Sequence, residues 1–165
     1  MPRASSAMLS AMKGSAHFSR CGQYRYQLSR CWDPTLSGCT FIGLNPSTAD
    51  ADTNDPTIRR VISFAQEEGF GGVIVCNLFA FRATRPEDLK ASIDPVGPRN
   101  NFWIRRSIAE SDLTVVAWGN HGIFNDRAAR VLRYLRDPMC LGTTSLGQPK
   151  HPLYLAKTTS LRPYS

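Results

Sequence analysis

The chain has 165 residues, of which 42% are hydrophobic and 20% are charged, so it is long enough for one domain and apolar enough for a packed core. This composition excludes a wholly disordered protein, and no stretch approaches the ~20 apolar residues of a membrane span, so a soluble, cytoplasmic protein is expected. The net charge is +7, and 16 of the 20 cationic residues are arginines, whose planar fork suits phosphate and carboxylate oxygens. An anionic partner such as nucleic acid or a nucleotide is one explanation, and a solvated basic surface is the other.

The first segment, residues 1–19, is rich in Ser, Ala and Met and carries no acidic residue, which predicts a loose tail before a single domain over residues 20–165. The five cysteines are odd in number, and no two have the spacing of a zinc or iron–sulfur site. We therefore expect reduced thiols, with Cys76 buried, and neither a metal nor another cofactor.

The first predicted elements are two strands. Residues 23–32 alternate aromatic or apolar with polar side chains, and residues 39–44 form a more hydrophobic run. The second strand ends at Asn45, because Pro46 removes a backbone donor from the ladder. A polar loop, residues 47–54, follows.

A helix is predicted next, because Asp55 can cap it and Pro56 suits its first position. Its apolar residues recur at helical spacing up to Gly69, a C-terminal stop signal. Residues 72–79 then form a short continuous apolar run, as expected of a strand buried on both faces. The loop that follows, residues 81–100, is a candidate active-site loop.

The second half of the chain repeats this alternation. It predicts a helix over residues 98–111, a buried strand over residues 113–118, a helix capped by Asn125, and a short strand near residues 139–141. The last of these helices carries four arginines on its polar face, and they either track a phosphate backbone or are simply solvated: Arg127, Arg130, Arg133 and Arg136.

Buried strands that alternate with amphipathic helices predict an α/β fold. We expect three layers (α/β/α) around a central, mostly parallel four-stranded sheet, with an additional N-terminal strand or hairpin. Ligands of such sheets bind outside the carboxyl ends of the strands. The polar groups expected there come from four loops: Asn45, Pro46 and Ser47; Asn77, Phe79 and Arg82; Gly119, Asn120 and His121; His151, Pro152 and Leu153.

Three of these side chains can carry chemistry. The Asn45 amide can position a water, or it is a turn asparagine that bonds its own backbone. Asn77 interrupts an apolar run, and because an unsatisfied buried amide costs about 1–3 kcal/mol, either a neighbouring loop or a ligand such as the edge of a base must satisfy it. His151 can donate to a developing oxyanion or act as acid or base, or it is a surface turn histidine.

The other candidates have competing interpretations. Asp50 is a possible general base or, with its acidic neighbours, a magnesium ligand, but it can equally solvate the loop. Phe79 stacks on a flat ring or packs in the core. Arg82 binds phosphate or is solvated. His121 lies in a similar turn to His151, but the sequence supports a functional role for it less strongly.

Several runs carry a resemblance to a known family over roughly residues 23–165. FIGLNPSTADADTNDPTIRR, VCNLFAFRAT, DPVGPRNN, VVAWGNHG and GQPKHPLYL closely resemble an uncharacterised family of small bacterial and phage proteins, a domain of unknown function. The order of the motifs is distantly similar to that of the uracil-DNA glycosylase superfamily. The Gly-hydrophobic-Asn-Pro motif at residues 43–46, the strand that ends in Asn77, and the closing His151-Pro152 motif carry this second resemblance.

The resemblance implies roles for individual residues. Asn45 would position the attacking water, Asn77 would read the base edge, and His151 would stabilise negative charge on the departing base. Leu153 or Tyr154 would wedge into the base stack while the base flips out. Within this resemblance, Asn45 would be a weaker activator of the water than an aspartate, because an amide cannot accept a proton.

The predicted function is that of a base-recognising enzyme acting on nucleic acid (DNA), specifically a hydrolase of the N-glycosidic bond of a modified or damaged base. One alternative is an enzyme or binder of free nucleotides or nucleosides. The other is a non-catalytic nucleic-acid-binding module that relies on Arg82, Arg127 and Arg130.

Overall fold

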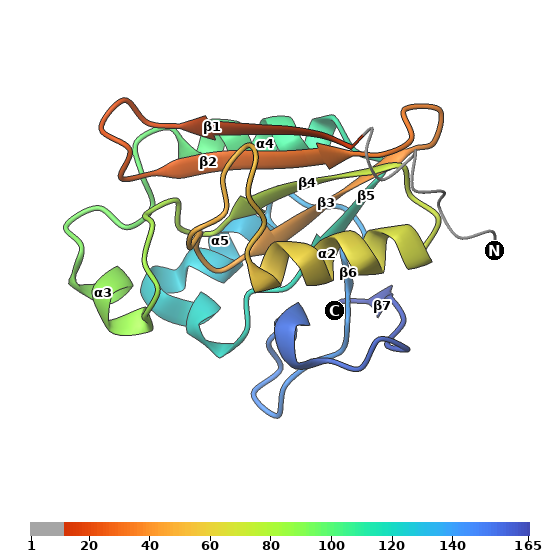
Figure 1. Cartoon of the computed structure of the whole chain (residues 1–165). Helices are drawn as coiled ribbons and strands as arrows, with labels where there is room; N and C mark the ends of the chain where they lie inside the picture. Colours follow the sequence, from red (N-terminus) through yellow and green to blue (C-terminus); the bar gives the residue numbers. More distant parts are fainter. Residues whose placement is uncertain (1–11) are drawn as a thin grey trace.

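The computed structural model describes residues 12–165, which form a mixed α/β structure around one seven-stranded mixed sheet (Figure 1). The strands lie in the order β1-β2-β4-β3-β5-β6-β7. Their bounds are Lys13–Phe18 (β1), Arg25–Cys31 (β2), Gly38–Gly43 (β3), Gly72–Asn77 (β4), Leu113–Val116 (β5), Met139–Cys140 (β6) and Arg162–Pro163 (β7).

The α-helices of the described part are Pro56–Glu67 (α2), Pro86–Ala91 (α3), Asn100–Ala109 (α4) and Arg127–Leu132 (α5). Two short 3₁₀ segments, Asn120–Asp126 (η1) and Pro152–Tyr154 (η2), complete the chain. Within residues 12–165 no helix combines the length and the apolar character that crossing a membrane requires.

The centre of the sheet is parallel. β3 pairs in parallel with β4 on one side and with β5 on the other, and β6 continues in parallel from β5. Antiparallel strands extend both edges, β2 and β1 beyond β4, and β7 beyond β6. The sheet is thus larger than the four strands and hairpin expected from the sequence. The carboxyl ends of β3, β4 and β5 lie at one edge, as parallel pairing requires.

The parallel strands are buried because successive residues pack on opposite faces. Phe41, Val75 and Val115 belong to one hydrophobic cluster, together with the apolar side of α2. Their immediate neighbours in the chain, such as Ile42 and Val116, belong to a second cluster that includes residues of α4 and α5. Figure 1 shows α2 in front of the sheet and α4 behind it. Burial on both faces explains the nearly continuous apolar runs in these strands.

The local signals around α2 are confirmed. The Asp55 carboxylate accepts a hydrogen bond from the Ile58 N–H at 2.9 Å, and Pro56 occupies the first turn. Beyond the helix, Gly69 adopts a φ of 85°, a left-handed conformation that suits glycine. The cap fixes where α2 begins, and it also places the carboxylate of Asp55 at the helix N-terminus, next to the carboxyl end of β3.

Three local expectations are wrong. Residues 13–18 form β1 and so are not part of a tail, while the rest of the expected tail, residues 1–11, lies outside the described residues. Asn125 does not cap α5, because it adopts a φ of 55° and the helix begins two residues later, at Arg127. The segment 81–100 is not all loop, since it contains α3.

Candidate functional site

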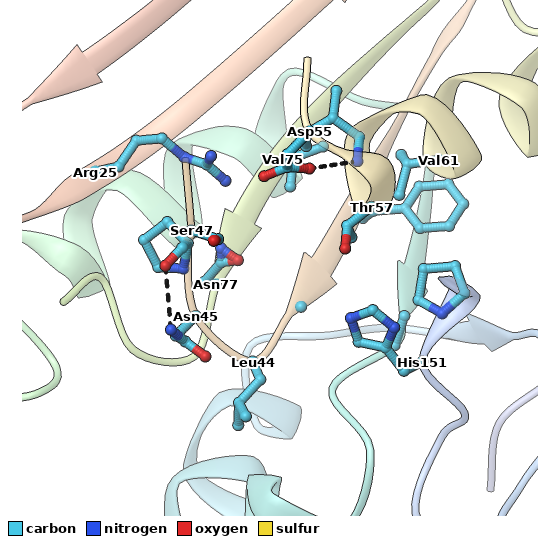
Figure 2. Close-up of a pocket in the computed structure, with 16 residues that line it drawn as sticks. Arg25, Leu44, Asn45, Ser47, Asp55, Thr57, Val61, Val75, Asn77 and His151 are labelled. Carbon is cyan, nitrogen blue, oxygen red and sulfur yellow. Dashed lines mark hydrogen bonds between the residues drawn. The ribbon is translucent and has the colours of Figure 1, made fainter. Parts of the chain in front are cut away.

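A pocket opens at the carboxyl edge of the parallel strands (Figure 2). Its empty volume, open mouth included, is about 460 Å³. Six residues predicted from the sequence line it: Asn45, Pro46, Ser47, Asn77, His151 and Pro152. They come from the β3 exit, the end of β4 and the segment before η2, so stretches of chain more than a hundred residues apart meet in one place. Apolar side chains of β3, β4 and α2, among them Phe41, Val75 and Val61, form another part of the wall.

Asn77, the last residue of β4, is 3% exposed and lines the pocket. Its buried Nδ2 has no hydrogen-bond partner, and no residue in the described part of the chain donates to its Oδ1. The absence of a side chain at Gly43 leaves room for this amide, because a Cβ there would lie 3.2 Å from Asn77 Oδ1. The protein therefore buries a donor, Asn77 Nδ2, that remains free for a ligand, and the described residues leave its Oδ1 free as an acceptor.

Asn45 is half-buried and uses its donor locally. Its Nδ2 donates to the Pro46 carbonyl at 3.1 Å and to the Ala83 carbonyl at 2.7 Å, which ties the β3 exit to the segment after β4. The turn interpretation of Asn45 is therefore correct for Nδ2. Its Oδ1 accepts no hydrogen bond from residues 12–165 and is left to accept one from a water or a ligand.

His151 stands across the pocket from Asn45 and Asn77 in Figure 2. Its Nδ1 accepts a hydrogen bond from the Leu153 N–H at 3.1 Å, so the ring proton of the neutral form is on Nε2. Burial lowers the pKa of His151, and the negative charge of Asp55 raises it in part. His151 is consequently a neutral imidazole at pH 7, with Nε2–H available as a donor.

We expect an NMR titration of the imidazole resonances to give His151 a pKa below its ordinary value of 6.5. Asp55→Asn removes the charge that opposes this shift and is expected to lower the pKa of His151 further. Because the folded protein then binds the proton more weakly than the unfolded chain does, this group costs stability as the pH falls below about 6.5. His151→Gln assigns the resonance, and a pKa at or above 6.5 in the wild-type protein would contradict the buried neutral ring.

Two charged residues of the pocket, Arg25 and Asp55, were not predicted as site residues. Arg25 is the first residue of β2 and is 3% exposed. Pairing between β1 and β2 shifts between His17 and Phe18, so Tyr26 is left without a partner. This bulge inverts the alternation, and it turns Arg25 to the face occupied by Leu28. The simple period of two would have placed Arg25 on the opposite face, so no local pattern indicated that it belongs to the site.

The guanidinium of Arg25 donates from Nη1 to the Ala49 carbonyl at 3.2 Å, and its buried Nε has no partner. Burial lowers the pKa of Arg25 to about 10, so the group stays protonated at pH 7. Asp55 is also buried, and besides capping α2 it accepts from the Ala49 N–H at 3.3 Å. The pocket thus contains one buried cation and one buried carboxylate.

Three of the predicted residues lie outside the pocket because the fold uses them otherwise. The Asp50 carboxylate accepts the N–H groups of Asp52 and Thr53, which lowers its pKa and closes the loop on itself. Phe79 is fully buried and packs against Phe124 at 5.7 Å between ring centroids. Arg82 is exposed beside the pocket, where it donates to the Ser47 carbonyl at 3.5 Å.

The turn after β5 supports the segment that leads to His151 but does not line the pocket. The Gly119 N–H donates to the Pro149 carbonyl at 2.8 Å, and Asn120 Oδ1 accepts from the Thr144 hydroxyl at 2.6 Å. His121 is exposed to solvent. Leu153 also lies outside the pocket, with its N–H on His151, and the neighbouring Tyr154 is 88% exposed.

Comparison with known proteins gives one match. The family model described as "Protein of unknown function (DUF1643)" matches residues 25–153, which span all six predicted residues of the pocket. No curated protein and no solved structure matches the chain. The expected resemblance to an uncharacterised family is confirmed, whereas these comparisons do not show the similarity to uracil-DNA glycosylases.

Proposed function

We propose that this chain, which belongs to the DUF1643 family, binds a nucleobase of a nucleic acid in the pocket and hydrolyses the bond between base and sugar. The observation that carries the proposal is the Asn77 amide, which is buried at the pocket with neither its donor nor its acceptor used by the described protein. On this proposal the α2 face, the sheet and the α4 face correspond to the three layers of a fold similar to uracil-DNA glycosylases.

The polar groups of the pocket suit the charge changes of this reaction. When the C1′–N bond breaks, its electron pair leaves with the base, and donors fixed in a water-poor site stabilise the resulting anion. Asn77 Nδ2 and His151 Nε2 are such donors. The apolar wall that includes Phe41 and Val75 suits the faces of a flat ring.

Water supplies the new C1′–O bond and releases its proton to solvent. Asn45 Oδ1 accepts one hydrogen of that water and so orients it, although an amide cannot remove the proton. This favours a mechanism in which the base departs before the water adds, because the cationic sugar left behind needs only a weak nucleophile.

A nucleic acid would reach the pocket over exposed groups at its rim. Arg82 is exposed next to Ser47, and Tyr154 projects into solvent next to His151, where an aromatic ring suits stacking or wedging between bases. The chain's charge of +7 favours contact with phosphates.

A second candidate is an enzyme or binder of free nucleotides or nucleosides. The buried cation Arg25 favours it, because a free nucleotide can bring its own charged group into the pocket.

The third candidate, a non-catalytic nucleic-acid-binding module, loses one of the arginines on which it was expected to rely. Arg127 is 3% exposed and donates to the Leu78 carbonyl and Asn101 Oδ1, so it does not reach a phosphate backbone. That candidate then depends on Arg82 and Arg130.

The proposal predicts that the purified protein generates abasic sites in oligonucleotides. A panel carrying uracil, hypoxanthine and modified bases is incubated with enzyme, and strand cleavage after alkali reports abasic sites. His151→Ala removes one fixed donor and is expected to lower the rate about 10²–10³-fold.

Salt titration separates the candidate that acts on free nucleotides or nucleosides from the other two. Binding of a duplex through several phosphates weakens steeply with salt, whereas binding of a nucleoside does not. Two results together would favour the binding module over the proposed enzyme. The protein would release no base from any substrate. Its duplex binding would be weakened by Arg82→Ala and Arg130→Ala but unchanged by His151→Ala and Asn45→Ala.

A further inference from the structure

Among the buried arginines of residues 12–165, Arg25 has the fewest hydrogen bonds. The ion pairs in residues 12–165 involve only the exposed side chains of Arg85 and Arg106. Arg30 is buried but satisfied, because its Nε, Nη1 and Nη2 all donate to Asn54 Oδ1 or to backbone carbonyls. Arg127 is held by two such bonds. Among residues 12–165 Arg25 makes a single hydrogen bond, and its buried Nε has no partner there.

The guanidinium of Arg25 lies at the pocket, which Arg25 lines. Nη1 is anchored on the Ala49 carbonyl, so Nε and Nη2 remain, and these two N–H groups point in parallel from one edge of the guanidinium. Figure 2 shows the guanidinium end of Arg25 reaching in from β2, on the same side of the pocket as Asn77 and Ser47. A fork of this kind suits two adjacent acceptor atoms of an anionic group.

The charges around Arg25 are not balanced locally. Asp55 lines the same pocket but forms no ion pair with Arg25, and both of its oxygens accept backbone N–H groups. A buried charge without a close partner is costly, and a ligand of opposite charge removes that cost. Asn77 Nδ2 and His151 Nε2 add two more donors without adding positive charge.

We propose that Arg25 is the counter-ion of a planar anionic ring, so that the pocket prefers a nucleobase in its anionic form over the neutral base. The inference rests on the proposed function, in which the departing base carries away the electron pair of the C1′–N bond. Arg25 then neutralises that charge, the water-derived proton goes to solvent, and the released base takes up a proton from solvent. The apolar wall favours a ring over a small, strongly hydrated ion such as phosphate.

Free bases test this directly at pH 7.5 by isothermal titration calorimetry. 5-Nitrouracil and urate are anionic there, while uracil and hypoxanthine are neutral rings of similar size. We expect the wild-type protein to bind the anionic rings about 10- to 100-fold more tightly than the neutral ones, as a charge-assisted fork implies. Arg25→Gln is expected to abolish this preference, and Arg25→Lys, which retains the charge without the fork, to keep only part of it.

Asp55→Asn is expected to change the affinity for anionic rings in the opposite direction. Asparagine still accepts a hydrogen bond at the N-cap of α2, but it removes the negative charge that competes with the ligand. Affinity for 5-nitrouracil is therefore expected to rise, which no misfolded variant would imitate. Arg59→Gln, an exposed residue of α2, is the matched control for the loss of one positive charge, and thermal melting verifies the fold of each variant.

Equal affinity for anionic and neutral rings would overturn the inference, and so would Arg25-dependent binding of inorganic phosphate with no binding of the anionic rings. The experiments test this inference and the proposed function separately. If the protein prefers anionic rings but releases no base from any oligonucleotide, the inference stands and the proposed activity is wrong. If it releases bases equally well after Arg25→Gln, the proposed activity stands and the inference is wrong.

Discussion

Asn77→Ala is expected to lower kcat/KM for base release about 10²–10³-fold, which is the loss that follows removal of one fixed donor from a site of developing negative charge. Nδ2 of Asn77 is buried at the pocket and bonds to nothing else in the described chain, so the whole of its hydrogen-bonding capacity is available to the ligand. Abasic-site formation on the best substrate of the panel measures the loss.

The same residue predicts a contrasting effect on stability. Because the described protein does not use the Asn77 amide, Asn77→Leu exchanges an unsatisfied buried donor for an apolar group with the same branching and number of heavy atoms, and it is expected to leave the melting temperature unchanged or higher. Asn77→Asp places an acceptor where the donor stands and is expected to lose at least as much activity as Asn77→Ala. A marked fall in stability with unchanged activity would show that Asn77 is a structural residue.

Asn100→Ala is expected to lower the free energy of unfolding by about 2–3 kcal/mol, since a buried polar group left without its partner costs about 1–3 kcal/mol and truncation adds a cavity. Asn100 begins α4 and is fully buried. Its Nδ2 donates to the Asn77 carbonyl at 2.9 Å and to the Leu78 carbonyl at 3.0 Å. Arg127 Nε also reaches the Leu78 carbonyl, at 2.7 Å, so the substitution leaves only the Asn77 carbonyl without its side-chain donor.

Urea denaturation of Asn100→Ala measures this loss. Asn120→Ala is a suitable control, because Asn120 is exposed and makes one side-chain bond, to Thr144, so its loss is expected to cost less than about 1 kcal/mol. Equal stability of the two variants would mean that the carbonyls at the β4 exit do not need Asn100.

The central strands were predictable because their signal is local. Residues 39–44 and 113–118 are short apolar runs that stand next to turn residues, and the structure places β3 and β5 there. The two terminal strands gave no such signal. β1 is a polar edge strand with largely exposed side chains, and β7 has two residues, so neither shows the alternation or the apolar run that predicts a strand.

The site was predictable where it follows from strand ends and missed where it depends on the direction of a side chain. Asn77 ends β4 and Asn45 lies two residues beyond the end of β3, and parallel strands bring such ends together. The sequence left two roles open for Asp50, and its bonds to the N–H groups of Asp52 and Thr53, which form only in the folded loop, favour the loop role. The sequence left two roles open for Phe79, stacking on a ligand or packing in the core, and its complete burial shows that it packs in the core.

The amino-acid sequence by itself determined which segments become the central strands, where α2 begins, and that Asn45, Asn77 and His151 lie near one edge, because apolar periodicity, capping residues and prolines act over a few residues. Only the tertiary structure decided that Arg25 joins the pocket and that Arg127 does not serve as a surface cation. A bulge in β2 and burial beneath distant segments set the directions of these two side chains, and both depend on contacts between parts of the chain that no local pattern records.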